Sequence, residues 1–150
     1  MHEPTNRTEG VPLFEFCTDE DTRRLVADVE AGRIPVSCNV LYDQMGDLPD
    51  VTITDEATIL EVYALLSRIR VGDESMVSIT DSYHHVVFTL QDGTTVGWGF
   101  EGTGILVRGR TNYDVTGSGP LWTRVRALQN ELMENERAAA EDMGSASGID

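Results

Sequence analysis

The sequence contains no lysine, and all 11 of its basic residues are arginines. This absence excludes Schiff-base chemistry, a lysine-tethered pyridoxal phosphate and any phosphate-binding loop that depends on a lysine. Acidic residues number 26, so the formal net charge is −15. A chain this negative lacks the clustered cations that neutralise phosphates. We therefore expect no direct binding to nucleic acid.

Cysteine is scarce as well. Cys17 and Cys38 are too few for a disulfide scaffold, and the sequence leaves open whether they pair. Cys17 is expected to be a buried structural residue rather than a reactive thiol. No apolar run approaches the roughly 20 residues of a membrane helix, and the first residues lack a signal-peptide pattern. These observations predict a cytoplasmic protein without membrane association.

Catalytic and metal-binding motifs are missing too. His84 and His85 are adjacent in a predicted strand, so their side chains should point to opposite faces and cannot chelate one ion. Gly97-x-Gly99 and Gly102-x-Gly104 lie in and between predicted strands, not between a strand and a helix as in phosphate loops. We expect no metal, no cofactor and no enzymatic activity.

The chain length of 150 residues suits one domain. Residues 1–12 are polar and form an expected flexible lead-in, 13–137 form a single α+β domain, and 138–150 are expected to be a disordered acidic tail. Apolar spacing predicts helices over 18–30, over about 55–68, and from 118–120 to about 137. Thr18 is the expected cap of the first helix.

A Thr-Asp-Glu-x-Thr string occurs at 18–22 and again at 54–58. It is explained either by duplication of a strand–helix unit or by helix-capping chemistry that arose twice, and capping is favoured because Thr and Asp are preferred cap residues. Strands are predicted over 13–17, 36–42 and 51–53. An antiparallel meander is predicted over about 83–115, packed on one face by the second and third helices.

The Asp92-Gly93 pair predicts a two-residue hairpin turn. This register places His84 opposite Glu101, and Val87 on the same face as Trp98. A similar turn at Gly102-Thr103 extends the pattern. The predicted core face then contains Val87, Val96, Trp98, Phe100, Ile105 and Val107.

The opposite face in this register is mixed, with Val86, Phe88 and Leu90 beside Arg108 and Arg110. A face exposed only to water would not carry so many apolar residues. Two explanations stay open. The N-terminal segment 13–45 packs on this face, or the face binds a partner or ligand.

Most of the negative charge lies in residues 1–56, which hold 13 acidic residues and four arginines. A biased base composition or a salty habitat would also produce this acidity. The leading hypothesis is a small non-catalytic binding or inhibitory protein that docks a basic macromolecular partner, with a nucleic-acid mimic directed against a defence nuclease as one form of it. The candidate contact residues are Asp19, Glu20, Asp21, Val86, Phe88, Arg108 and Arg110. The alternative is a small-ligand or enzymatic site formed by His84, Glu101, Arg108 and Arg110.

Overall fold

The computed structural model describes residues 10–43, 49–76, 83–102 and 104–148, and for 142–148 it describes the backbone alone. The elements follow in the order β1 (Val11–Pro12), α2 (Leu13–Phe16), α3 (Glu20–Glu30), β2 (Ser37–Asp43), β3 (Val51–Ile53), α4 (Glu56–Ser67), β4 (Arg70–Glu74), β5 (Tyr83–Thr89), β6 (Thr95–Glu101), β7 (Ile105–Arg108), β8 (Thr111–Thr116) and α5 (Gly119–Gly148).

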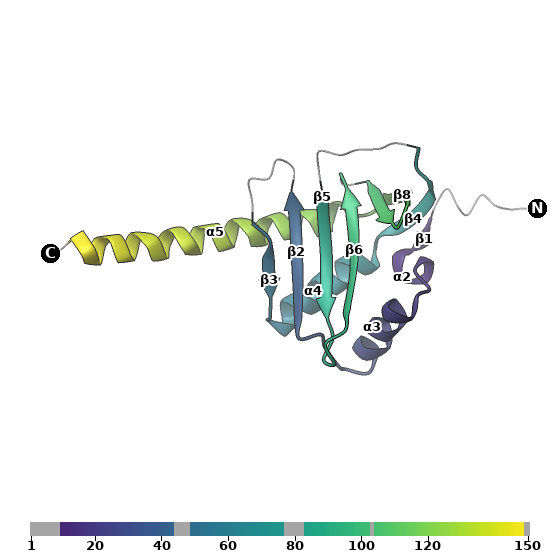
Figure 1. The fold of residues 1–150 in the computed structure, drawn as a ribbon, viewed down its shortest axis with the longest axis horizontal. Coiled ribbons are helices and arrows are strands. Elements are labelled where there is room, and N and C mark those ends of the chain that lie inside the picture. The colour runs from purple at the N-terminus through teal and green to yellow at the C-terminus, as the bar shows by residue number, and fades with distance from the viewer. Residues whose placement is uncertain (1–9, 44–48, 77–82, 103, 149–150) are drawn as a thin grey trace, which may run out of the picture.

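The strands form one eight-stranded antiparallel sheet in the order β1-β4-β8-β7-β6-β5-β2-β3. Helix α4 joins β3 at one edge to β4 near the other, and it lies behind the sheet together with the first part of α5 (Figure 1). The α+β class and the antiparallel meander that the sequence predicts are confirmed.

Side-chain caps begin both α3 and α4. Asp19 accepts a hydrogen bond from the Thr22 backbone N–H at 3.0 Å, and Asp55 accepts one from the Thr58 N–H at 2.9 Å. The repeated Thr-Asp-Glu-x-Thr string therefore caps two helices in the same way. The cap of α3 is Asp19 and not Thr18, which corrects the predicted assignment by one residue.

The register of the β5–β6 hairpin differs by one residue from the prediction. Val86 pairs with Trp98, so Val87 and Trp98 lie on different faces of the sheet. The turn holds three residues instead of two: Gly93 N–H donates to the Leu90 carbonyl, Leu90 N–H donates to the Thr94 carbonyl, and Gly93 has a φ of +91°. This is a type I turn followed by a glycine bulge, and Asp-Gly suits it as well as it suits the shorter turn.

The next hairpin shows the same difference, because Phe100 pairs with Leu106 and not with Ile105. Both slips move side chains to the other face. The helix-covered face now holds His84, Val86, Phe88, Val96, Trp98, Phe100 and Leu106, which belong to the buried side chains of the protein. Of the predicted core face, Val87, Ile105 and Val107 belong on the other side.

The N-terminal segment packs on the covered face and not on the opposite one. Leu13 of α2 and Leu25 of α3 belong to the same buried cluster as Val86 and Phe88. The indole N–H of Trp98 donates to the Cys17 sulfur at 3.3 Å. The strand predicted over 13–17 is the short helix α2, and β4 was not predicted at all. All four helices of the described ranges therefore cover one face of the sheet.

Helix α5 is longer than predicted. Leu121 and Val125 are buried against the sheet, whereas every side chain from Glu134 to Glu141 is exposed. The helix continues to Gly148 and projects beyond the rest of the fold (Figure 1). The chain is thus helical over residues 138–148, where a disordered tail was expected, and the three alanines at 138–140 favour helix even without tertiary contacts.

Candidate functional site

The predicted acidic contact residues begin helix α3. Burial opposes ionisation of Asp19, but hydrogen bonds from Thr22 and the charge of Arg108 outweigh it and lower the pKa of this carboxyl. Asp19 also accepts a hydrogen bond from Arg108 at 2.9 Å. It therefore stabilises the fold. Glu20 makes a long 3.7 Å ion pair with Arg24, and Asp21 is exposed.

The other predicted contact residues are not brought together. Val86 and Phe88 are fully buried under the helices, which corrects the prediction that they lie on an accessible face. Arg108 is half-buried and bonded to Asp19, while Arg110 is exposed in the turn between β7 and β8.

The alternative site of His84, Glu101, Arg108 and Arg110 is also divided. His84 is fully buried on the covered face, and Glu101 lies on the opposite face because it pairs with Tyr83. A single ligand cannot contact both through one face of the sheet. The geometry therefore contradicts this set of residues as one site.

The side of the sheet away from the helices, called the outer face below, has its own composition. Its central row contains Leu41, His85, Gly99 and Val107, and the next row contains Asp43, Tyr83, Glu101, Ile105 and Asp114. Leu41, Val87 and Val107 are only half-buried, and Tyr83 is 49% exposed. Arg108, the one arginine in strands β2, β5, β6, β7 and β8, pairs with Asp19 on the helix side. The described part of this face thus combines partly exposed apolar groups with carboxylates.

Two glycines shape the outer face. A Cβ atom at Gly97 would come within 2.8 Å of the Val87 side chain, and one at Gly99 would come within 3.1 Å of the Tyr83 hydroxyl. The missing side chains let Val87 and Tyr83 lie close against β6. Glycine in a strand interior often marks such a close approach of a neighbouring group.

A hydrogen-bond chain fixes His85 on the same face. The Asn39 amide nitrogen donates to Asp50 at 2.8 Å and to Thr52 at 3.0 Å, so the amide oxygen of Asn39 faces the His85 ring at 2.6 Å. His85 Nε2 must then donate, which leaves Nδ1 as a hydrogen-bond acceptor in the neutral ring. Burial lowers the pKa of His85, although the charge of Asp50 opposes this shift.

A second feature is a cavity beside helix α5, with a volume of about 480 Å³. The residues that line it are Tyr42, Gly119, Trp122, Thr123, Arg126, Ala127 and Asn130. The Arg126 guanidinium lies 5.6 Å from the centre of the Tyr42 ring. We call this feature the α5 cavity.

An aromatic cluster supports the wall of the α5 cavity. The Tyr42 ring stacks on His84 at 4.2 Å, and Trp122 packs 5.1 Å from His84. His84 Nδ1 accepts a hydrogen bond from the Asp43 backbone N–H, and burial lowers its pKa to about 4. His84 is therefore neutral near pH 7 and holds Tyr42 in place by packing. No local sequence pattern signals this role, since Tyr42 and Trp122 are distant in the chain.

Both cysteines lie in the core. Cys17 and Cys38 are both buried and unpaired with each other. Burial raises the pKa of the Cys17 thiol, and it raises that of Cys38 to about 12. The expected burial of Cys17 is confirmed, and Cys38 is buried as well.

Comparison with known proteins finds no relative: no family model, no curated protein and no solved structure matches the chain. Within the described ranges, no helix combines the length and the apolar character needed to cross a membrane.

Proposed function

We propose that this protein is a non-catalytic binding protein whose outer face docks a basic macromolecular partner. The observation that carries the proposal is the one-sided sheet: every described helix packs on the face of Val86 and Phe88, and the outer face is left with half-buried apolar side chains and carboxylates. An apolar centre supplies area that is removed from water on binding, and the surrounding charge selects the partner.

The charge distribution supports a cationic partner. Asp43, Glu101 and Asp114 share one row of the outer face. A field of one sign over a binding surface raises the association rate and rejects partners of the same sign. An inhibitor that occupies the nucleic-acid groove of a basic enzyme is one form of this function, because carboxylates can stand in the place of phosphates.

His85 supports specific recognition at the same place. Its ring is held by Asn39, and its Nδ1 atom is an acceptor in the neutral state. An arginine or lysine N–H of the partner can donate to that atom. The proposed docking surface therefore offers a polar contact at its centre as well as a charged border.

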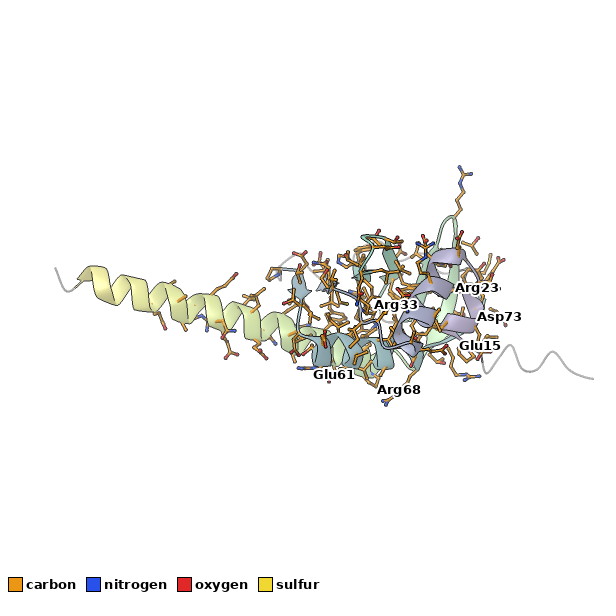
Figure 2. All side chains as sticks on the ribbon, turned by 90° about the horizontal axis from the view of Figure 1, so that it is seen from below. Glu15, Arg23, Arg33, Glu61, Arg68 and Asp73 are labelled. Atoms are coloured by element: carbon orange, nitrogen blue, oxygen red, sulfur yellow. The ribbon has the colours of Figure 1, made fainter. Side chains whose placement is uncertain are left out.

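Site-resolved crosslinking in an extract of the native host tests the proposal. A photoreactive phenylalanine analogue in place of Leu41 or Val107 would crosslink a partner bound to the outer face. The same analogue in place of Arg68, which projects from the end of α4, would crosslink a partner bound on the helix side (Figure 2). We expect one crosslinked basic protein from the outer face only, with a yield that falls between 0.1 and 1 M salt as the Debye length shrinks from about 10 Å to about 3 Å. Equal products from both sides, or none from the outer face, would contradict the proposal.

A further inference from the structure

His85 is the titratable side chain in the central row of the outer face, where it lies between Leu41 of β2 and Gly99 of β6. The residue is partly exposed. Its Nδ1 atom has no hydrogen-bond partner in the described part of the chain. The buried side-chain polar atoms that lack a partner in these ranges belong to Trp122 and Gln129. The Nδ1 atom of His85 is therefore not buried, and a docked partner can reach it.

The hydrogen bonds of Asn39 determine which ring nitrogen of His85 carries the proton. The Asn39 amide nitrogen donates to Asp50 and Thr52, so the amide oxygen accepts from Nε2 of His85 at 2.6 Å. Because Nε2 carries the proton of the neutral ring, a second proton must bind to Nδ1. Protonation therefore turns the surface atom from an acceptor into a donor and adds a positive charge.

The charge state of His85 depends on its surroundings. The nearest titratable groups on the described outer face are Asp50 before β3, Asp43 of β2, Glu101 of β6 and the Tyr83 ring, which contacts the imidazole edge-on at 5.9 Å. Burial lowers the pKa of His85, and the charge of Asp50 opposes this shift without cancelling it. The ring is thus neutral near pH 7 and takes up its second proton below its ordinary pKa of 6.5.

We propose that His85 makes docking on the outer face dependent on pH, so that the basic partner binds near neutral pH and is released in mild acid. A cationic N–H of the partner donates to Nδ1 of the neutral ring, whereas the protonated ring presents a donor and a like charge at the same point. Carboxyl groups of ordinary pKa, about 4, stay largely ionised at about pH 5, so they would not cause this release. The inference rests on the proposed docking function and adds its regulation.

Nitrogen NMR of the full chain, labelled at histidine, tests the first part of the inference. His85→Gln removes the ring signals of this residue and so assigns them. We expect Nε2 of His85 to carry the proton at about pH 7.5, and Nδ1 to take up a proton below its ordinary pKa. A proton on Nδ1 at about pH 7.5 would overturn the inference and leave the docking proposal standing.

Crosslinking of a fluorescent nona-arginine peptide, used as a defined basic probe, tests the second part. A photoreactive phenylalanine analogue in place of Val107, which shares the central row with His85, reports peptide bound to the outer face. From about pH 7.5 to about pH 5, the yield should fall about threefold with His85 present. It should fall by less than about 1.5-fold in His85→Gln, because the amide keeps an acceptor and stays neutral. The analogue in place of Arg68 is the control position, where the yield should stay low and independent of pH.

Circular dichroism at each pH establishes that the variants remain folded. Equal falls in yield with His85 and with His85→Gln, or no fall in either, would overturn the pH dependence and leave the docking proposal standing. No saturable crosslinking through position 107 at either pH would overturn both.

Discussion

His84 and His85 are consecutive in β5, yet they lie on opposite faces of the sheet and have different contacts. His84 lies on the covered face, is fully buried, and stacks on Tyr42. His85 lies on the outer face, is partly exposed, and is held by a chain of side-chain hydrogen bonds through Asn39. The covered face uses its residues to pack the core, whereas the outer face keeps polar atoms and half-buried apolar groups at the surface. We infer that the first face determines stability and that the second determines recognition.

The largest expected effect comes from truncation of the covered face. Phe88 is fully buried and packs edge-on against Tyr63 and Trp98. Phe88→Ala should lower the free energy of unfolding by about 3–5 kcal/mol, because it leaves a cavity that the core cannot fill. Urea denaturation measures this value. A loss below about 1 kcal/mol would show that Phe88 does not lie in the core and that β5 pairs in another register.

Low pH should destabilise the fold through protonation of His84 on the covered face. Its folded-state pKa of about 4 lies below the ordinary value of 6.5, so the unfolded chain binds a proton more readily than the folded chain does. The stability that depends on neutral His84 is complete above about pH 6.5 and is lost as the pH falls toward 4, with a total on the order of 3 kcal/mol. The dependence of the denaturation midpoint on pH across this window should flatten more in His84→Phe than in His85→Phe, because burial lowers the pKa of both rings but is complete only for His84. Identical pH profiles in the native chain and His84→Phe would exclude His84 as the cause.

Two neighbouring valines give a direct test of the two faces. Val86 is fully buried, and Val87 lies half-buried on the outer face. Val86→Ala should lower the free energy of unfolding by about 2 kcal/mol, and Val87→Ala by less than about 1 kcal/mol. A methyl group contributes more to stability when it is fully buried. The same denaturation experiment compares them. The reverse order would mean that Val87, and not Val86, lies on the covered face.

At the acidic start of α3, a smaller change in stability should distinguish the helix cap from a carboxylate that only carries charge. Asp19 caps the helix, so Asp19→Ala should lower stability by about 1 kcal/mol. Asp21 is exposed within the first helical turn and is not the cap residue, so Asp21→Ala should change stability by no more than about 0.5 kcal/mol. Thermal unfolding of both variants checks the pair. Equal losses would mean that local charge, and not the cap, governs this turn.

The helices and strands of this fold are easier to predict from the sequence than the face of the sheet on which each side chain lies. Capping residues and apolar spacing place α3 and α4, and alternation places β5 to β8, because these signals are local. The predicted faces are wrong because Val86, Val87 and Phe88 are consecutive apolar residues, so alternation does not say which side is buried. The register then depends on the turn chemistry of Asp92-Gly93, and that pair suits loops of two or three residues.

The candidate sites are less accessible to sequence reasoning. In the α5 cavity, Trp122, Arg126 and Asn130 follow helical spacing, but Tyr42 joins them only through the tertiary fold. The Asp50–Asn39–His85 chain likewise links residues of different elements. The charge of Asp19 predicts a docking residue, although its cap and its bond to Arg108 give it a structural role. Charge alone does not separate these roles.

The association rate with the crosslinked partner tests the central claim most directly, through two charge reversals on opposite sides of the molecule. Asp114→Arg changes the outer face, and Glu15→Arg makes the same change of charge on α2, where Glu15 lies at the helix side (Figure 2). In stopped-flow mixing at about 0.1 M salt, we predict that Asp114→Arg slows association by about tenfold and Glu15→Arg by less than about twofold. If both reversals slow association equally, net charge alone drives binding, and the outer face is not the docking surface.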